Sequence, residues 1–323
     1  METQKESEEK GDFCFLANVK TFLSNFDMQQ EEYWLGGMLG VMGFYFTTLK
    51  TGIPSVVNGR SDEFEGLYAH FVEYLKEPLV TERFTGKEEA LVRAGVLLRA
   101  GMVPMMWMDE YYLPLAYNYG KNHLWVMAVI QKETEASFEI FNNEKRIMQK
   151  EKSEELLFRD GVIEIQYAPS RPGWKYTEKE MAVKGLRQVV DNLRKTSSLE
   201  EQYFGIEGMR EYKKVFEACR DFNVIYDYFY EMNRGGGLYK TRRNLHLFLQ
   251  ELEKRWPSRE GQACASLYAE LEEKWTKITN LTFKLSISKD PGLQQRIGKR
   301  LEEAILLEEQ GIKQMEELMK ALI

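Results

Sequence analysis

The sequence predicts an α+β domain over residues 12–168, followed by an all-helical domain over residues 169–323. Three observations lead to this division. Short apolar runs of strand length occur only before Pro169, at 102–108, 124–131, 137–143 and 162–168. Long stretches with helical spacing dominate after it. The chain has 323 residues, 43% of them hydrophobic, which is enough for two hydrophobic cores.

The first domain is expected to begin with a helix over 14–26, where apolar residues fall at positions 15, 16, 19, 22, 23 and 26. A short helix after Asp27, a strand within 40–49 and a helix over 62–76 follow. The stretch 85–101 predicts another helix, because Thr85 and Glu88 fit a capping box and Gly101 suits the C-terminal cap.

The second domain is expected to contain helices near 178–195, 206–233, 237–255, 259–286 and 291–322. Pro257 and Pro291 separate three of them. At the other end of the chain, residues 1–11 are polar and acidic, and we expect this tail to be disordered.

Composition and charge exclude several classes of protein. The net charge is −7 and the pI is about 5.4, which argues against nucleic-acid binding. No apolar stretch approaches the roughly 18 residues that a membrane helix needs, and the charged N-terminus does not predict a signal peptide. We therefore expect a cytoplasmic protein. The three cysteines form no CxxC pair, so neither a disulfide framework nor a metal site is predicted.

Cys14, His123 and Asn142 are the candidate catalytic residues. Cys14 begins the first predicted helix, whose N-terminus favours a thiolate. His123 enters one apolar strand and Asn142 ends the next, so a hairpin would bring the two close together. An imidazole can accept the thiol proton, and a third group can orient it. The alternative is that Cys14 is a buried, inert residue and that the other two serve turns.

Asp109 is a further candidate, because it follows the strand at 102–108. It could line a cleft or replace Asn142 as the group that orients His123, and a solvated loop acid is the alternative. The other two cysteines, Cys219 and Cys264, lie within predicted helices and are interpreted as small hydrophobic residues.

Several stretches resemble the butirosin biosynthesis protein H type of acyltransferase. In the first domain they are FCFLANVKTFL around Cys14, LGGMLGVMGFYF, GMVPMMWMDEYYLPL and NHLWVMAVIQ. In the second they are GGGLYKTRRNLHLFLQEL and YAELEEKWTKITNLTFKLS. The resemblance covers nearly the whole chain. It implies a papain-like (C39 peptidase-like) N-terminal domain with a helical C-terminal domain.

The resemblance also implies a reaction. An acyl group would arrive as a thioester on the phosphopantetheine arm of a carrier protein, form an acyl-Cys14 intermediate and pass to an amine, giving an amide in antibiotic or other secondary-metabolite biosynthesis. The closthioamide pathway contains a papain-like enzyme that makes amides in this way. No cofactor of the protein's own is implied.

The same resemblance suggests which side chains would bind substrate. Glu8 stands where papain-like enzymes carry an oxyanion-binding glutamine, so Asn18 is the candidate donor beside the Cys14 N–H. Trp107, Tyr111 and Tyr112 could form the wall of a dry cleft. Lys240, Arg242 and Arg243 are candidates for docking the carrier, and a solvated helix face is the alternative.

Two other functions remain open. One is hydrolysis, by a thioesterase or peptidase with the same Cys/His/Asn triad. The other is a catalytically inactive, papain-like binding module. The sequence does not settle the oligomeric state, and a homodimer is one alternative.

Overall fold

A computed structural model of the chain describes residues 13–48, 57–60, 64–113, 119–121, 123, 125–152, 161–196, 201–233 and 236–323. The tail that we expect to be disordered, residues 1–11, lies outside them. The chain divides into two compact units. Unit 1 contains Met1–Glu32 and Val72–Lys175, and unit 2 contains Tyr33–Phe71 and Tyr176–Ile323.

The units differ from the predicted domains in two respects. Residues 33–71, expected in the first domain, belong to unit 2, and the later boundary falls at 175–176 rather than 168–169. The physical reason is strand pairing, since β1 (Met42–Thr47) pairs on one side with β2 (Val57–Arg60) and on the other with β9 (Gln202–Phe204). Unit 2 is therefore not all-helical. The prediction of a mixed α+β protein is confirmed.

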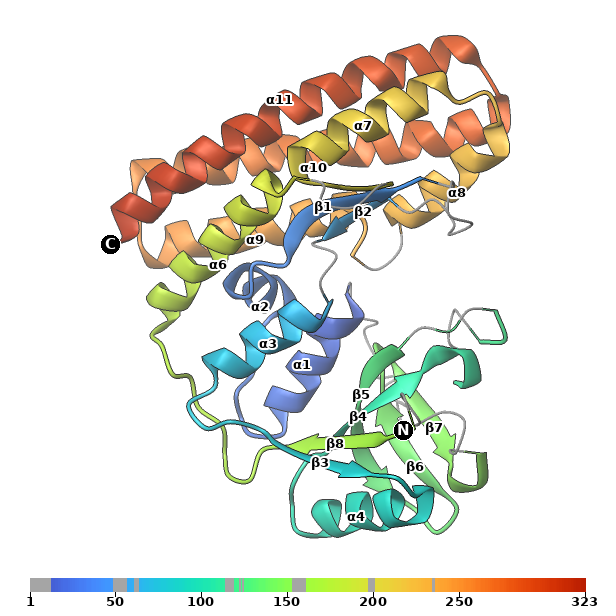
Figure 1. The fold of residues 1–323 in the computed structure, drawn as a ribbon. Helices are drawn as coiled ribbons and strands as arrows, with labels where there is room; N and C mark the ends of the chain where they lie inside the picture. Colours follow the sequence, from blue (N-terminus) through green and yellow to red (C-terminus); the bar gives the residue numbers. More distant parts are fainter. Residues whose placement is uncertain are drawn as a thin grey trace, which may run out of the picture. The chain divides into compact units, whose positions relative to one another are not determined.

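Unit 1 is built on a six-stranded sheet in which every neighbouring pair is antiparallel, in the order β3-β8-β4-β5-β6-β7 (Figure 1). Its strands are β3 (Val80–Phe84), β4 (Met105–Asp109), β5 (Trp125–Glu133), β6 (Ser137–Phe141), β7 (Lys145–Gln149) and β8 (Ile163–Tyr167). Its helices are α1 (Cys14–Ser24), α4 (Lys87–Arg99) and the single 3-10 turns η2 (Glu110–Tyr112) and η3 (Lys150–Lys152). Four of the strands match the predicted runs.

The two faces of this sheet have different partners. Met106, Met108, Ala128 and Ile130 point to the face covered by α4 and form one buried cluster with it. Because side chains alternate along a strand, residues 105, 107 and 109 of β4 and residues 125, 127 and 129 of β5 point to the opposite face. Helix α1 packs against β5.

The ends of α4 only partly match the prediction. The helix begins at Lys87 after Gly86, and no side chain caps its N-terminus, so the predicted capping box from Thr85 to Glu88 is wrong. The reason is that the N-cap is Gly86, one residue later than the capping box requires, and glycine has no side chain to cap the helix. Gly101 has φ of +76°, the left-handed conformation that favours glycine after a helix, as predicted.

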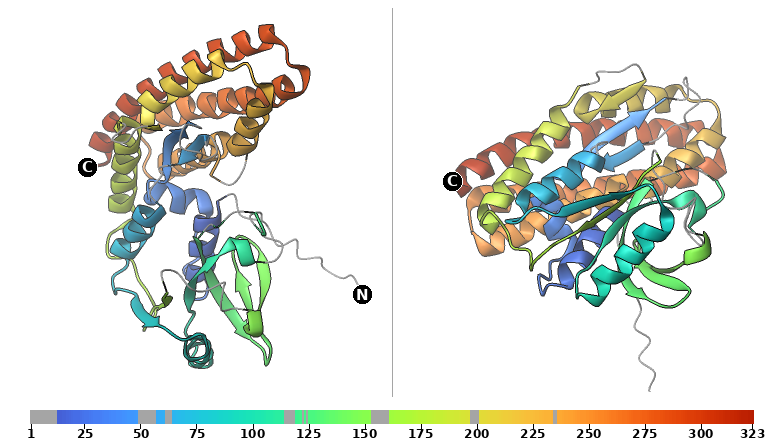
Figure 2. Two further views of the ribbon diagram at one scale, coloured as in Figure 1. Left: turned by 45° about the vertical axis from the view of Figure 1, so that its right-hand side comes forward. Right: turned by 60° about the horizontal axis from the view of Figure 1, so that its bottom comes forward.

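Unit 2 packs long helices over its three-stranded sheet. Figures 1 and 2 show α7, α10 and α11 side by side, and α6, α7 and α9 contact β1. The helices of unit 2 are α6 (Glu178–Arg194), α7 (Gly205–Ala218), α8 (Phe222–Asn233), α9 (Leu238–Arg255), α10 (Arg259–Ser288) and α11 (Pro291–Leu322). The helix predicted over 206–233 is split into α7 and α8. Two short helices span the boundary between the units in sequence, α2 (Glu32–Met38) and α3 (Phe64–Tyr74).

A fully buried ion pair links α9 to α11 in this unit. Arg242 of α9 donates through Nε to Glu308 Oε1 of α11 at 2.7 Å, and both side chains are 0% exposed. Its Nη1 donates to two backbone oxygens, Gly43 O at 2.8 Å and Gly59 O at 3.0 Å. Trp275 of α10 donates to the same Glu308 oxygen at 2.9 Å. Arg242 therefore cannot belong to an exposed basic patch.

Candidate active site

His123 and Asp109 form a hydrogen-bonded pair at one end of the unit 1 sheet. Asp109 is the last residue of β4 and pairs with Trp125, the first residue of β5, so His123 stands two residues before that strand. His123 Nδ1 lies 2.6 Å from Asp109 Oδ2. This end of the sheet therefore brings together two residues that are 14 positions apart.

The environment of Asp109 determines which ring nitrogen of His123 can act as a base. The carboxylate side chain is 4% exposed, and its Oδ1 accepts a hydrogen bond from Tyr111 N at 3.0 Å. Both oxygens are thus engaged. Because an ionised carboxylate only accepts hydrogen bonds, Nδ1 carries the proton and Nε2 of the neutral ring is left with its lone pair. The His123 side chain is 62% exposed.

Cys14 is the first residue of α1 and is partly exposed. The N-cap residue is Phe13, whose side chain cannot accept a hydrogen bond, and the first turn contains no acidic residue. The positive end of the helix dipole favours a thiolate at Cys14. The carboxylate of Glu32 lies at the same helix end, where its Oε2 accepts from Phe13 N at 3.4 Å, and offsets part of this effect. Cys14 forms no disulfide.

Asn18 fixes α1 against the strand that follows His123. Its Nδ2 donates a short hydrogen bond to Met127 O, and its Oδ1 accepts from Asn143 N at 3.2 Å. Asn18 lies four residues after Cys14, and Met127 lies four residues after His123, so this contact joins α1 and β5 at matching distances along the chain from the two candidate residues. Asn18 is 1% exposed and both ends of its amide are engaged. In this arrangement the residue anchors the helix, and its role as an oxyanion donor stays a prediction.

Asn142 occupies a different place from the one predicted. It is 2% exposed, and its Nδ2 donates to Met127 O at 3.4 Å. The pairing of β5 with β6 matches Val129 to Phe141, so the end of β6 reaches only the level of Met127 and stops short of His123. The group that orients His123 is thus Asp109, the alternative that the sequence offered. The strand-end position of Asp109, opposite the start of the next strand, is the signal that identifies it.

The three aromatic residues predicted to wall a cleft have distinct surroundings. Trp107 is 6% exposed and lies in β4 opposite Met127. Tyr111 stacks on His123, with ring centroids 4.3 Å apart and an interplanar angle of 17°. Tyr112 meets the same imidazole at 5.8 Å and 59°, and also packs against the buried cluster under α4. Two of the three therefore contact the candidate base itself.

The remaining thiols and imidazoles lie away from this arrangement. Burial raises the pKa of Cys264 to about 12 and also raises the pKa of Cys219 above its ordinary value. Cys264 is buried within α10, in agreement with its interpretation as a small hydrophobic residue. Cys219 follows the end of α7 as its C-cap residue, and its thiol donates to Asp221 O at 3.2 Å, so the prediction that it lies within a helix is wrong. His246 of α9 pairs with Glu272 of α10 at 2.8 Å, and His70 is half-buried in α3.

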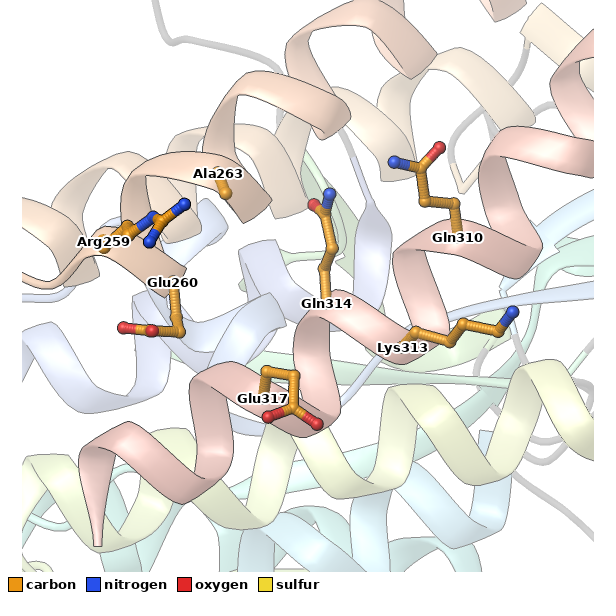
Figure 3. A pocket seen from close by; sticks show the side chains of 7 residues that line it. All are labelled: Arg259, Glu260, Ala263, Gln310, Lys313, Gln314 and Glu317. Carbon is orange, nitrogen blue, oxygen red and sulfur yellow. The ribbon is translucent and has the colours of Figure 1, made fainter.

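Unit 2 contains a pocket of about 240 Å³ between the start of α10 and the second half of α11 (Figure 3). Two cationic and two anionic side chains and two glutamines line it together with Ala263; the lining residues are Arg259, Glu260, Ala263, Gln310, Lys313, Gln314 and Glu317. Gln314 points from α11 towards α10, and its Oε1 has no hydrogen-bond partner among the described residues. None of the predicted catalytic residues lines this pocket.

Among the residues described, no cluster of three or more His, Cys, Asp or Glu side chains is arranged to hold a metal ion. Over the same part of the chain, no helix combines the length and apolar character needed to cross a membrane.

Comparison with known proteins does not identify a family. No protein-family model matches the chain, and no curated protein matches it at a significant level. The class of the protein is therefore defined by its own fold and site: an α+β protein with a cysteine at a helix N-terminus and an Asp–His pair at the end of the sheet against which that helix packs.

Proposed function

We propose that the protein is a cysteine-dependent acyltransferase that forms amides through an acyl-Cys14 intermediate, with a papain-like arrangement in unit 1. The observation that carries the proposal is the Asp109–His123 contact of 2.6 Å, since it leaves Nε2 of the imidazole as the basic nitrogen. The placement of Cys14 as the first residue of α1 supports it. The acyl donor would be a thioester on the phosphopantetheine arm of an acyl or peptidyl carrier protein.

The proposed reaction has two halves. His123 Nε2 accepts the Cys14 proton, and the sulfur attacks the thioester carbonyl carbon. The tetrahedral intermediate collapses, the carrier thiol leaves with the proton from His123, and an acyl-cysteine thioester remains. An amine then attacks this thioester, gives its proton to His123 and forms the amide. The Cys14 sulfur leaves and takes that proton back, so the enzyme is regenerated.

Asp109 has a positioning part in both halves. Its carboxylate keeps the proton on Nδ1 and stabilises the imidazolium that forms when Nε2 is protonated. Because the carboxylate is buried and also accepts from Tyr111 N, its orientation is fixed before substrate arrives. The backbone N–H of Cys14, at the helix N-terminus, is the proposed donor to the oxyanion.

Hydrolysis of the same acyl-enzyme is the second candidate function. The observation that favours it is the exposure of the His123 side chain, 62%, which lets water reach the imidazole that would activate it. A thioesterase or peptidase would use the same residues up to the acyl-enzyme. The two functions differ only in whether an amine or water takes the acyl group.

The test uses the full chain and a panel of acyl N-acetylcysteamine thioesters of different chain length. Intact-mass measurement should show one acyl adduct that hydroxylamine removes. The adduct should be absent in Cys14→Ala and present in Cys219→Ala, the matched control. Product analysis with and without added amines then separates amide from free acid. If no thioester gives an adduct, and a phosphopantetheinylated acyl carrier also gives none, a binding module is the better account.

A further inference from the structure

Tyr111 covers one face of the candidate base. Its ring lies nearly parallel to the imidazole of His123, at 17° and with centroids 4.3 Å apart. No other ring contact of His123 in the described residues is parallel, since Tyr112 meets it at 59° and 5.8 Å. The His123 side chain is 62% exposed. Because water does not fix the plane of an exposed ring, the parallel contact with Tyr111 is the one among the described residues that can.

The backbone of Tyr111 is held at both of its polar groups. Its N–H donates to Asp109 Oδ1 at 3.0 Å, and its carbonyl accepts from Gly120 N at 2.9 Å. Gly120 has φ of +65°, so the turn that returns to Tyr111 uses a conformation that favours glycine. The ring of Tyr112 meets the ring of Tyr111 edge-on at 4.8 Å. Tyr111 is therefore a fixed surface rather than a mobile side chain.

Asp109 links the two partners of His123. One carboxylate oxygen bonds the imidazole and the other bonds the backbone of the residue whose ring stacks on that imidazole. A single hydrogen bond at Nδ1 leaves the imidazole plane free to turn about the bonded atom. A stack against a fixed ring removes that freedom, and the two contacts together determine where Nε2 points.

We propose that Tyr111 is a positioning residue that holds the His123 imidazole in the plane set by Asp109, so that Nε2 faces the reacting thiol. This inference rests on the proposed function. The same contact acts a second time within the reaction. When His123 carries the Cys14 proton it is a cation, and the face of an aromatic ring attracts cations. Tyr111 therefore supports both the free base and its protonated form.

The stack itself is tested by NMR on the full chain, which has only three histidines, His70, His123 and His246. The His123 ring protons, assigned with His123→Ala, should show nuclear Overhauser contacts to Tyr111 and an upfield shift from its ring. Tyr111→Phe should keep the shift and Tyr111→Leu should remove it. Tyr119→Leu, which alters an exposed tyrosine of the same loop, should leave it unchanged. Absence of these contacts in the unmodified protein would overturn the inference even if Tyr111→Leu did not fold.

The positioning role is tested by the rate at which iodoacetamide alkylates Cys14 as a function of pH. An aromatic pair typically accounts for about a 2- to 10-fold effect, so Tyr111→Leu should slow alkylation by about that factor, with the largest change on the acid side of the profile. Tyr111→Phe should restore the rate. Equal profiles for Tyr111→Leu and the unmodified protein would refute the positioning role. Slow alkylation already in the unmodified protein would instead count against the proposed function.

Discussion

Replacement of Asp109 by asparagine should switch the proton on His123 from one ring nitrogen to the other. The carboxylate accepts two hydrogen bonds, one from Tyr111 N at 3.0 Å and one from His123 Nδ1 at 2.6 Å. An asparagine has one accepting oxygen and one donating NH2 group. It can therefore satisfy only one of the two donors that now face Asp109.

The structure indicates which contact survives. If the amide NH2 faced Tyr111 N–H, two buried donors would meet, at a cost of about 1–3 kcal/mol. The oxygen should therefore remain on Tyr111 N, and the NH2 should face Nδ1. Nδ1 then becomes the acceptor, the proton moves to Nε2, and the basic lone pair disappears from the nitrogen that would serve Cys14. In the serine-protease triad the same exchange lowers kcat by about 10⁴, and we expect a loss of about 10³ to 10⁴ here.

The assay is the rate of acyl-Cys14 formation from an N-acetylcysteamine thioester, followed by intact mass. The matched control is Asp221→Asn, because Asp221 also accepts from the backbone N–H two residues ahead, at 2.9 Å, without a histidine partner. The control variant should form the acyl adduct at the same rate as the unmodified protein and should have the same Tm. If Asp109→Asn acylates within about threefold of the unmodified protein, far from the loss that the triad precedent predicts, the assignment of Asp109 as the orienting group is refuted.

Three further changes test the packing that supports the site and the two units. Asn18→Ala should destabilise unit 1 by about 1–3 kcal/mol in urea denaturation, because it leaves Asn143 N–H without its side-chain partner and Met127 O with only the longer contact from Asn142. The exposed control Asn25→Ala should change little. Arg242→Met should lower the free energy of unfolding by about 3–5 kcal/mol, because it leaves Glu308 buried and unpaired. Adding Glu308→Leu should restore part of that stability, and a double variant less stable than Arg242→Met alone would contradict this reasoning. Hydrogen bonds from Arg93 lower the pKa of Glu82 below 4.5. The ionised Glu82 therefore stabilises the folded state by under about 1 kcal/mol above that pH, and this contribution fades in acid. The Tm difference between Glu82→Gln and the unmodified protein should therefore close as the pH falls, and a difference that grows in acid would refute the sign.

Local pattern was enough to predict most of the secondary structure. The helices at 178–194, 238–255, 259–288 and 291–322 lie within two residues of the expected ranges, because their apolar spacing and their capping residues agree. The sequence did not predict strands β2, β3, β7 and β9. In β7 only Met148 of the five residues is fully buried, so its alternation is weak.

Long-range pairing could not be predicted. Strand β1 pairs with β9, about 155 residues later in the chain, and nothing in either segment specifies the other as partner. That pairing moves residues 33–71 into unit 2. Arg242 shows the same limit, because its sequence neighbours suggest an exposed basic face while Glu308, 66 residues away, makes burial possible.

The candidate site was predicted in part. Cys14 and His123 were identified from chemical type and position, and Asp109 was named as an alternative. The choice between Asp109 and Asn142 depends on the strand register, which places Asp109 opposite Trp125 and Asn142 beside Met127. A register is a property of two strands together, so it cannot be derived from either strand alone. The stack of Tyr111 on His123 likewise required the structure.

The most direct test of the central claim is the pH dependence of iodoacetamide alkylation at each of the three cysteines, followed by peptide mapping. Cys264 and Cys219 serve as internal references, since burial raises the pKa of both thiols. If Cys14 is the nucleophile and His123 its base, Cys14 should be labelled at pH 6 while the other two are not, and His123→Ala should abolish that early labelling. Labelling of Cys14 only in the alkaline range, with the same profile in His123→Ala, would contradict the account.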